Sequence, residues 1–202
     1  MGDRVTMAAF SGVADVEGSL SACEAVLLEM GLVAEGYDPS AVLSPRHGRV
    51  RRPGHAAAKA TAYGDRLLEL RTDGVSFEGP GYFNARALGF SDWFDCPSCD
   101  GRVDQSHPSF TDQISHLGFA AVDWVEGDRD ATALCVMCDA ATSVPDWRLE
   151  DPVFLADMAV AFWNWPFLAR DAGALTEWWH VDVVAALEGA VGRPAALSGY
   201  KI

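Results

Sequence analysis

The sequence predicts an α+β fold with a small mixed or antiparallel sheet and about three main helices. Half of the 202 residues are apolar and 22% are charged, a composition typical of a folded chain with a sizeable core. Strand and helix patterns follow one another without the strict alternation of a doubly wound parallel sheet. We therefore treat 1–202 as a single α+β domain in which 93–147 is an inserted metal-binding β module.

The N-terminal segment is predicted to contain one strand and one amphipathic helix. The strand covers Arg4–Phe10, and the helix is capped by Asp15 and ends near Gly31. An apolar stripe with steps of four and three residues marks the buried side of the helix: Val16, Leu20, Cys23, Leu27 and Met30. Cys23 belongs to this stripe, so we interpret it as a core residue and not as a metal ligand.

A hairpin is the clearest feature of the next segment. Arg66–Thr72 and Val75–Gly79 are predicted to pair through Asp73-Gly74, which suits a two-residue type I′ turn. The preceding basic segment, 44–55, has no apolar period and is predicted to be a loop. Residues 79–90 contain a Gly-Pro-Gly and are predicted to be irregular.

The second half of the chain is predicted to contain two strands, two helices and a final strand. The first two strands cover 118–126 and 131–136 and are joined by a turn. A helix is predicted over 151–166, because it has proline at its first helical position and apolar residues on one side. A last helix is predicted to be capped by Thr176 and to stop at Gly192, and 195–202 returns as a strand.

Two cysteine pairs with the same spacing form the strongest motif of the chain. Cys96 and Cys99 enclose Pro-Ser, and Cys135 and Cys138 enclose Val-Met. Zinc prefers four tetrahedral nitrogen or sulfur ligands, and two cysteines separated by two residues can direct both sulfurs at one ion. The four cysteines are therefore predicted to hold one structural zinc ion per chain.

At this point the segment 93–147 resembles a zinc ribbon, in which two cysteine knuckles at β-turns hold a structural ion. It departs from a compact ribbon because 35 residues separate the pairs, compared with about 15–20 in that pattern. Asp100-Gly101 suits the positive φ of a tight knuckle, whereas Asp139-Ala140 offers no glycine and is expected to be less suited. The alternatives are a redox pair, a disulfide framework or no defined site. Catalytic zinc is disfavoured because four thiolates leave no open coordination position.

The chain is strongly acidic, with a net charge of −14 and a pI near 4.5. Residues 1–95 carry 9 basic and 13 acidic groups and residues 96–202 carry 6 and 16, so the half with the cysteine pairs is the more acidic. Such a surface repels nucleic-acid phosphates and favours a basic protein partner. No apolar stretch suits a membrane span or a secretory signal, so we expect a cytoplasmic protein without a membrane or nucleic-acid partner.

Two further groups of side chains are candidates for a partner or ligand surface. The basic segment 44–55 would bind a phosphate or an acidic peptide, or else form a solvated loop or pair with the protein's own carboxylates. Its arginines are Arg46, Arg49, Arg51 and Arg52. Trp163 and Trp179 lie off the main apolar stripes of the predicted C-terminal helices, so they are the better candidates among the tryptophans for a partner surface, with burial in the core as the alternative.

These observations favour a cytoplasmic zinc-containing protein whose zinc module stabilises a surface for binding another, basic protein. An immunity-type protein that blocks a basic toxin is one version of this hypothesis. The second hypothesis is an enzyme or small-ligand-binding protein with a cleft near the C-terminal helices and the arginine segment as an anion clamp. The third, a nucleic-acid-binding zinc ribbon, is disfavoured by charge. No catalytic residue is assigned, because no nucleophile, nucleotide-loop or metalloprotease motif is present.

Overall fold

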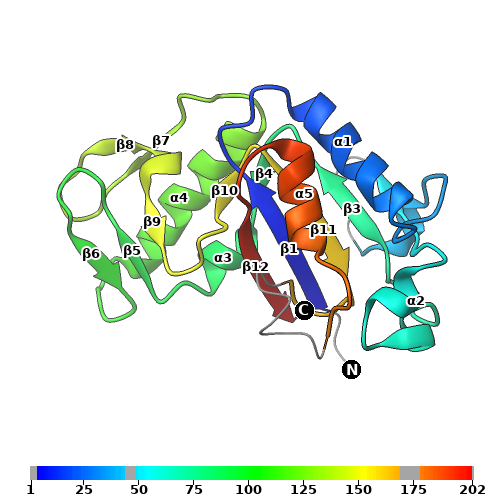
Figure 1. Cartoon of the computed structure of the whole chain (residues 1–202). Helices are drawn as coiled ribbons and strands as arrows, with labels where there is room; N and C mark the ends of the chain where they lie inside the picture. Colours follow the sequence, from blue (N-terminus) through cyan, green and yellow to red (C-terminus); the bar gives the residue numbers. More distant parts are fainter. Residues whose placement is uncertain (1–3, 44–48, 169–177, 202) are drawn as a thin grey trace. The chain divides into compact units, whose positions relative to one another are not determined.

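The computed structural model describes residues 4–43, 49–168 and 178–201 (Figure 1). The chain divides into two compact units. Unit 1 consists of Met1–Pro80 together with Asp157–Ile202, and unit 2 consists of Gly81–Ala156. Both units combine helices with antiparallel strands, which confirms the predicted α+β class.

A five-stranded antiparallel sheet with the order β12-β1-β11-β3-β2 forms the centre of unit 1. Its strands are β1 (Arg4–Phe10), β2 (Val50–Arg51), β3 (Val75–Glu78), β11 (Met158–Trp163) and β12 (Ala196–Lys201). The central pair runs from Val5 opposite Trp163 to Phe10 opposite Met158. Segments far apart in the sequence are thus joined by backbone hydrogen bonds. The predicted N-terminal strand is confirmed, and so is the C-terminal strand over its described residues.

The helix α1 (Val16–Glu29) begins and ends as predicted. The Asp15 carboxylate accepts a hydrogen bond of 2.9 Å from the backbone N–H of Gly18. Gly31 follows the helix with a φ of 67°, which glycine adopts without strain. Cys23 is fully buried in the core of unit 1, as predicted, and burial raises the pKa of its thiol to about 12.

The helix α5 (Val183–Val191) packs against α1 on one face of the sheet (Figure 1). It begins later than predicted, where the Asp182 carboxylate accepts a hydrogen bond of 2.9 Å from the N–H of Ala185. It ends as predicted at Gly192, which has a φ of 73°. The predicted cap, Thr176, lies outside the described residues.

The predicted hairpin around Asp73-Gly74 is wrong. β3 pairs with β11 and β2, whereas the other predicted arm begins in a 3-10 helix, Gly64–Leu67. Asp73 is buried, whereas the tip of a hairpin turn is normally exposed. Its carboxylate accepts a hydrogen bond of 3.0 Å from Arg52. The predicted loop 44–55 is also partly wrong, since it contains β2 and leads directly into α2 (Ala57–Ala60).

The predicted helix over 151–166 is wrong as well, because this segment forms β10 (Leu155–Ala156) and β11. All six residues of β11 are buried. A strand that is apolar on both faces lacks the period of two that marks a half-buried strand. Its apolar run therefore also fits one side of a helix, and the sequence pattern does not separate the two.

Unit 2 is built around one long helix, α4 (Phe110–Val125). Its strands form three small antiparallel sheets. The strands are β4 (Tyr82–Phe83) with β10, β5 (Trp93–Asp95) with β6 (Arg102–Asp104) and β9 (Arg148–Leu149), and β7 (Thr132–Leu134) with β8 (Ala141–Ser143). A short helix, α3 (Ala85–Gly89), packs against α4. The unit has its own apolar core, which includes Phe94, Leu117 and Trp147.

Two further predictions concern unit 2. The strand predicted over 118–126 is wrong, because these residues form the second half of α4. Gln113, Leu117 and Trp124 lie on the buried side of that helix at steps of four and seven residues, a period that starts before the predicted segment. The strand predicted over 131–136 is confirmed by β7.

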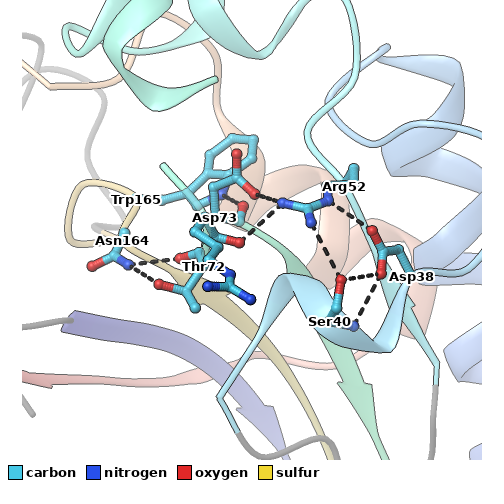
Figure 2. Close-up of polar contacts among 8 residues, drawn as sticks. Asp38, Ser40, Arg52, Thr72, Asp73, Asn164 and Trp165 are labelled. Carbon is cyan, nitrogen blue, oxygen red and sulfur yellow. Dashed lines mark hydrogen bonds and ion pairs between the residues drawn. The ribbon is translucent and has the colours of Figure 1, made fainter. Parts of the chain in front are cut away.

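A polar network ties the end of β11 to the loop before β3 (Figure 2). The side-chain nitrogen of Asn164 donates to the carbonyl oxygen of Thr72 at 2.6 Å and to its hydroxyl at 3.0 Å. The Asn164 amide oxygen accepts a hydrogen bond of 2.9 Å from the N–H of Arg4. The Trp165 indole donates to the Asp73 carbonyl at 2.7 Å, so the loop is held at two neighbouring points.

We expect Asn164→Ala to lower the free energy of unfolding by about 2–4 kcal/mol, because partly buried groups lose their partners and alanine is strained at a φ of 64°. Asn164→Gly is the matched control. It loses the same hydrogen bonds without the backbone strain, and should cost about 1–2 kcal/mol less. Chemical denaturation measures both losses of free energy. Equal losses for the two variants would show that the left-handed backbone at residue 164 does not penalise alanine.

Candidate metal centre

Two hairpins of the same design carry the cysteine pairs. β5 and β6 enclose residues 96–101, and β7 and β8 enclose residues 135–140. Each hairpin has three paired residues on either side of its loop, closed by Asp95 opposite Arg102 in one and Leu134 opposite Ala141 in the other. The chain therefore builds the same cysteine knuckle twice.

The hydrogen bonds within the two loops also correspond. In both, the N–H of the first cysteine, Cys96 or Cys135, donates to the carbonyl five residues on, at 2.9–3.0 Å. The N–H four residues on donates back to the carbonyl of that cysteine at 3.0 Å. The N–H two residues after the first cysteine donates to its sulfur at 3.4 Å in both loops. Donation to sulfur favours the thiolate, which is the form that binds metals.

Aspartate supplies the positive φ in each knuckle. Asp100 has a φ of 52° and Asp139 a φ of 56°, and aspartate tolerates this region better than most residues. The prediction that the second knuckle is less suited for lack of glycine is therefore wrong. Gly101 serves a different purpose, because a β-carbon there would lie 3.0 Å from the Met137 sulfur and 3.1 Å from that of Cys99. The two knuckles approach each other closely at this glycine.

The structure brings the four sulfurs of Cys96, Cys99, Cys135 and Cys138 within 4.8 Å of one another. A tetrahedral zinc site has sulfurs about 3.8 Å apart, given a Zn–S distance of about 2.3 Å. The first cysteine of each pair is buried and the second is exposed, so each knuckle provides one inner and one outer sulfur. The donor set and its spacing fit a tetrahedral metal ion. Among the described residues, this group contains no other potential ligand.

Four neighbouring thiols do not all ionise readily without a cation between them. Burial raises the pKa of the Cys135 thiol to about 12. Burial also opposes ionisation of Cys96, but hydrogen bonds from the N–H groups of Cys99 and Ser98 and from the Cys135 and Cys99 thiols together lower its pKa. A negative charge on any one of these sulfurs opposes ionisation of its neighbours. A divalent cation removes this opposition, so the chemistry of the donor set also fits Zn²⁺.

Gln113 is a residue of the site that sequence reasoning missed. Its side chain is fully buried on α4, where the amide nitrogen donates to the Leu134 carbonyl and the amide oxygen accepts from the Val136 N–H, both at 3.1 Å. The His116 ring lies 3.0 Å from the same Leu134 carbonyl. These contacts fix the second knuckle to α4. The only sequence signal was one polar residue in the apolar stripe of a helix.

The long connection between the pairs contains a helix of 16 residues. It contains β6, α4 and β7, whereas a compact ribbon joins its knuckles by a short β-segment. The inner cysteines belong to the apolar core of unit 2 together with residues of α4. The resemblance to a zinc ribbon therefore covers the two knuckles but not the connection between them.

The described arginines of the basic segment are paired with the protein's own carboxylates. Arg52 lies between two of them, 2.9 Å from Asp38 and 3.0 Å from Asp73 (Figure 2). Hydrogen bonds from Ser40 and Arg52 lower the pKa of the Asp38 carboxyl. Burial raises the pKa of Asp73, against the opposing effect of Arg52. Arg46 lies outside the described residues.

Arg49 and Arg51 share one buried carboxylate. Glu24 is 3.1 Å from each guanidinium and also accepts a hydrogen bond of 2.8 Å from the Tyr37 hydroxyl. The Arg51 guanidinium lies 4.4 Å from the centroid of the Tyr37 ring. Arg49 also pairs with the exposed Glu17 at 2.9 Å. The structure thus supports the alternative in which these arginines serve the protein's own fold.

Trp163 and Trp179 are buried, with exposed fractions of 9% and 6%, so they are wrong as candidates for an exposed partner surface and the core alternative holds. The Trp163 indole lies 3.4 Å from the Ser76 hydroxyl, within the sheet of unit 1. The Trp179 ring stacks on Trp165 at 5.7 Å between centroids, and its indole donates to the Phe167 carbonyl. The error has a physical reason for Trp163, because its segment is a buried strand and not a helix with one outer side.

No family model, curated protein or solved structure matches this chain. The functional argument therefore depends on the geometry of the chain's own residues. Among the described helices, none is both long and apolar enough to cross a membrane.

Proposed function

We propose that the chain is a cytoplasmic zinc protein in which one structural Zn²⁺ holds unit 2 in shape for binding another protein. The convergence of four sulfurs from two equivalent knuckles is the observation that supports the metal. Four thiolates complete a tetrahedral shell, so the ion has no open position for a substrate and acts in folding. Thiolate ligands are stable in a reducing compartment, which supports a cytoplasmic location.

Charge supports a basic protein as the partner. Unit 2 contains 13 acidic and 4 basic residues. Four thiolates around one dication add two further negative charges to the unit. Complementary charge increases the association rate and excludes partners of like sign, so an acidic module favours a basic protein and repels nucleic acid.

The small-ligand or enzyme hypothesis receives less support. Its anion clamp required free guanidinium groups, but Arg49, Arg51 and Arg52 each have carboxylate partners within the chain. If these arginines bound an anionic ligand, their existing ion pairs would have to break, which costs free energy.

The proposed function predicts that partner binding depends on the metal. A tagged chain purified from the cells that produce it should retain a basic protein in about equimolar amount at low salt and lose it at high salt. Cys138→Ser removes one ligand and should abolish both zinc and partner, whereas Cys23→Ala should retain both. Mass spectrometry of the eluate identifies the partner. Retention of nucleic acid, or equal recovery with the Cys138→Ser variant, would contradict the proposal.

A further inference from the structure

The solvent-facing side of α4 carries an unusually exposed aromatic residue. Phe119 exposes 74% of its surface, the largest fraction of any large apolar residue in the described chain. Val122 lies beside it one turn further on and exposes 41%. The opposite side of the same helix already packs into the core of unit 2 through Leu117 and Trp124. Phe119 is therefore not needed to attach α4 to its own unit.

Carboxylates surround Phe119 on this face. Asp112, Asp123 and Glu126 lie seven residues before, four after and seven after it, spacings that place them on the same side of a helix. All three side chains are exposed. The helix contains no lysine or arginine, and its one histidine, His116, is directed at a carbonyl of β7.

Two of these carboxylates lie where the helix itself opposes them. Asp123 and Glu126 are at the C-terminal end of α4, where the macrodipole is negative, and the last turn contains no basic residue. The nearest following cation, Arg129, lies over the ring of Trp124 at 3.9 Å from its centroid. The arrangement lowers the stability of the helix, and a cation supplied from outside would relieve the repulsion.

From this geometry we propose that the outer face of α4 is the docking surface of unit 2, with Phe119 as its anchor. The occupant is a basic segment of a partner protein, whose apolar side chains cover Phe119 and Val122 while its lysines or arginines face the surrounding carboxylates. A second copy of this chain would place carboxylates against carboxylates, so it is disfavoured. The inference rests on the protein-binding function proposed above and assigns its surface.

Titration of the isotope-labelled zinc-loaded protein with a 16-residue amphipathic lysine/leucine peptide tests the surface by NMR. Saturable shifts should centre on the amides of α4, and Phe119→Ser should weaken binding about tenfold or more. Phe90→Ser is the matched control, because Phe90 exposes 69% but has the Arg86 guanidinium over its ring. This variant should bind within about twofold of the wild type. A lysine/serine peptide should bind weakly to all three proteins.

A charge variant separates binding from stability. Asp123→Asn with Glu126→Gln should raise the melting temperature, because it removes repulsion from the helix end. The same variant should bind the peptide about fivefold or more weakly, with a smaller dependence on salt.

Three outcomes would overturn the surface. They are equal binding by the Phe119→Ser and Phe90→Ser variants, shifts centred outside α4, and dimerisation of the free protein that Phe119→Ser abolishes. With the first or second outcome, a partner that still co-purifies in a zinc-dependent way keeps the proposed function while the surface fails. Absence of any such partner would instead reject the proposed function itself.

Discussion

Replacing Cys135 with serine is expected to abolish metal binding and to unfold unit 2. Binding of structural zinc contributes about 10–16 kcal/mol, which is comparable with or larger than the whole stability of about 5–15 kcal/mol of a typical domain. Cys135 is fully buried, so the variant loses a ligand and also places a hydroxyl group in the core. Hydrogen exchange should show loss of amide protection throughout Gly81–Ala156, whereas the sheet of unit 1, which has a separate core, keeps its protection.

Cys23→Ala is the control for this experiment, because Cys23 is equally buried but lies in the core of unit 1, away from the sulfur cluster. It should retain one zinc per chain and cost only about 1 kcal/mol. Treating the wild type with a strong chelator should reproduce the Cys135→Ser result. Native protection of unit 2 in the Cys135→Ser variant would show that the metal does not hold this unit together.

Breaking the buried ion pair of unit 1 is expected to have the second largest effect. Glu24→Leu should lower the free energy of unfolding by about 3–5 kcal/mol, because it leaves the Arg51 guanidinium buried without its carboxylate. Glu24→Leu combined with Arg51→Met should cost less than Glu24→Leu alone, because no uncompensated charge remains. Urea denaturation measures the losses for Glu24→Leu, for Arg51→Met and for the double variant. A double variant as unstable as the sum of the two singles would contradict this explanation.

An exposed carboxylate provides the comparison for Glu24. Arg49 pairs with both Glu24 and Glu17, but the Glu17 side chain is 70% exposed. Glu17→Gln should therefore change the free energy of unfolding by less than about 1 kcal/mol. The difference between Glu17→Gln and Glu24→Leu measures how strongly burial increases the effect of losing a carboxylate that contacts the same arginine.

The elements that could be predicted are those with local signals. The first strand, the Asp15 cap of α1 and the Gly192 end of α5 depend on neighbouring residues, and all three are confirmed. Strand partners depend on residues far away in the sequence. β3 pairs with β11 across more than 80 residues of sequence, so a local Asp-Gly dipeptide suggested a hairpin that the sheet does not contain.

The same division applies to the cysteine site. The spacing within each pair was sufficient to identify the four cysteines as members of one candidate metal site. The structure brings their sulfurs together. The supporting groups were not predictable in the same way. An aspartate directly follows each pair, Asp100 and Asp139, and both adopt a positive φ. This repeat is visible in the sequence, but the prediction considered only glycine for the positive φ. Gln113 contacts the second knuckle from its position on α4. This contact was not predictable because part of that helix was interpreted as a strand.

X-ray absorption at the zinc edge, combined with metal quantification on the reduced protein, is the most direct test of the four-sulfur site. We predict one zinc ion per chain, bound by four sulfurs at about 2.3 Å and by no lighter ligand. A metal-free protein with four reactive thiols on the two knuckles, or a zinc ion bound by a mixture of nitrogen, oxygen and sulfur, would contradict the account.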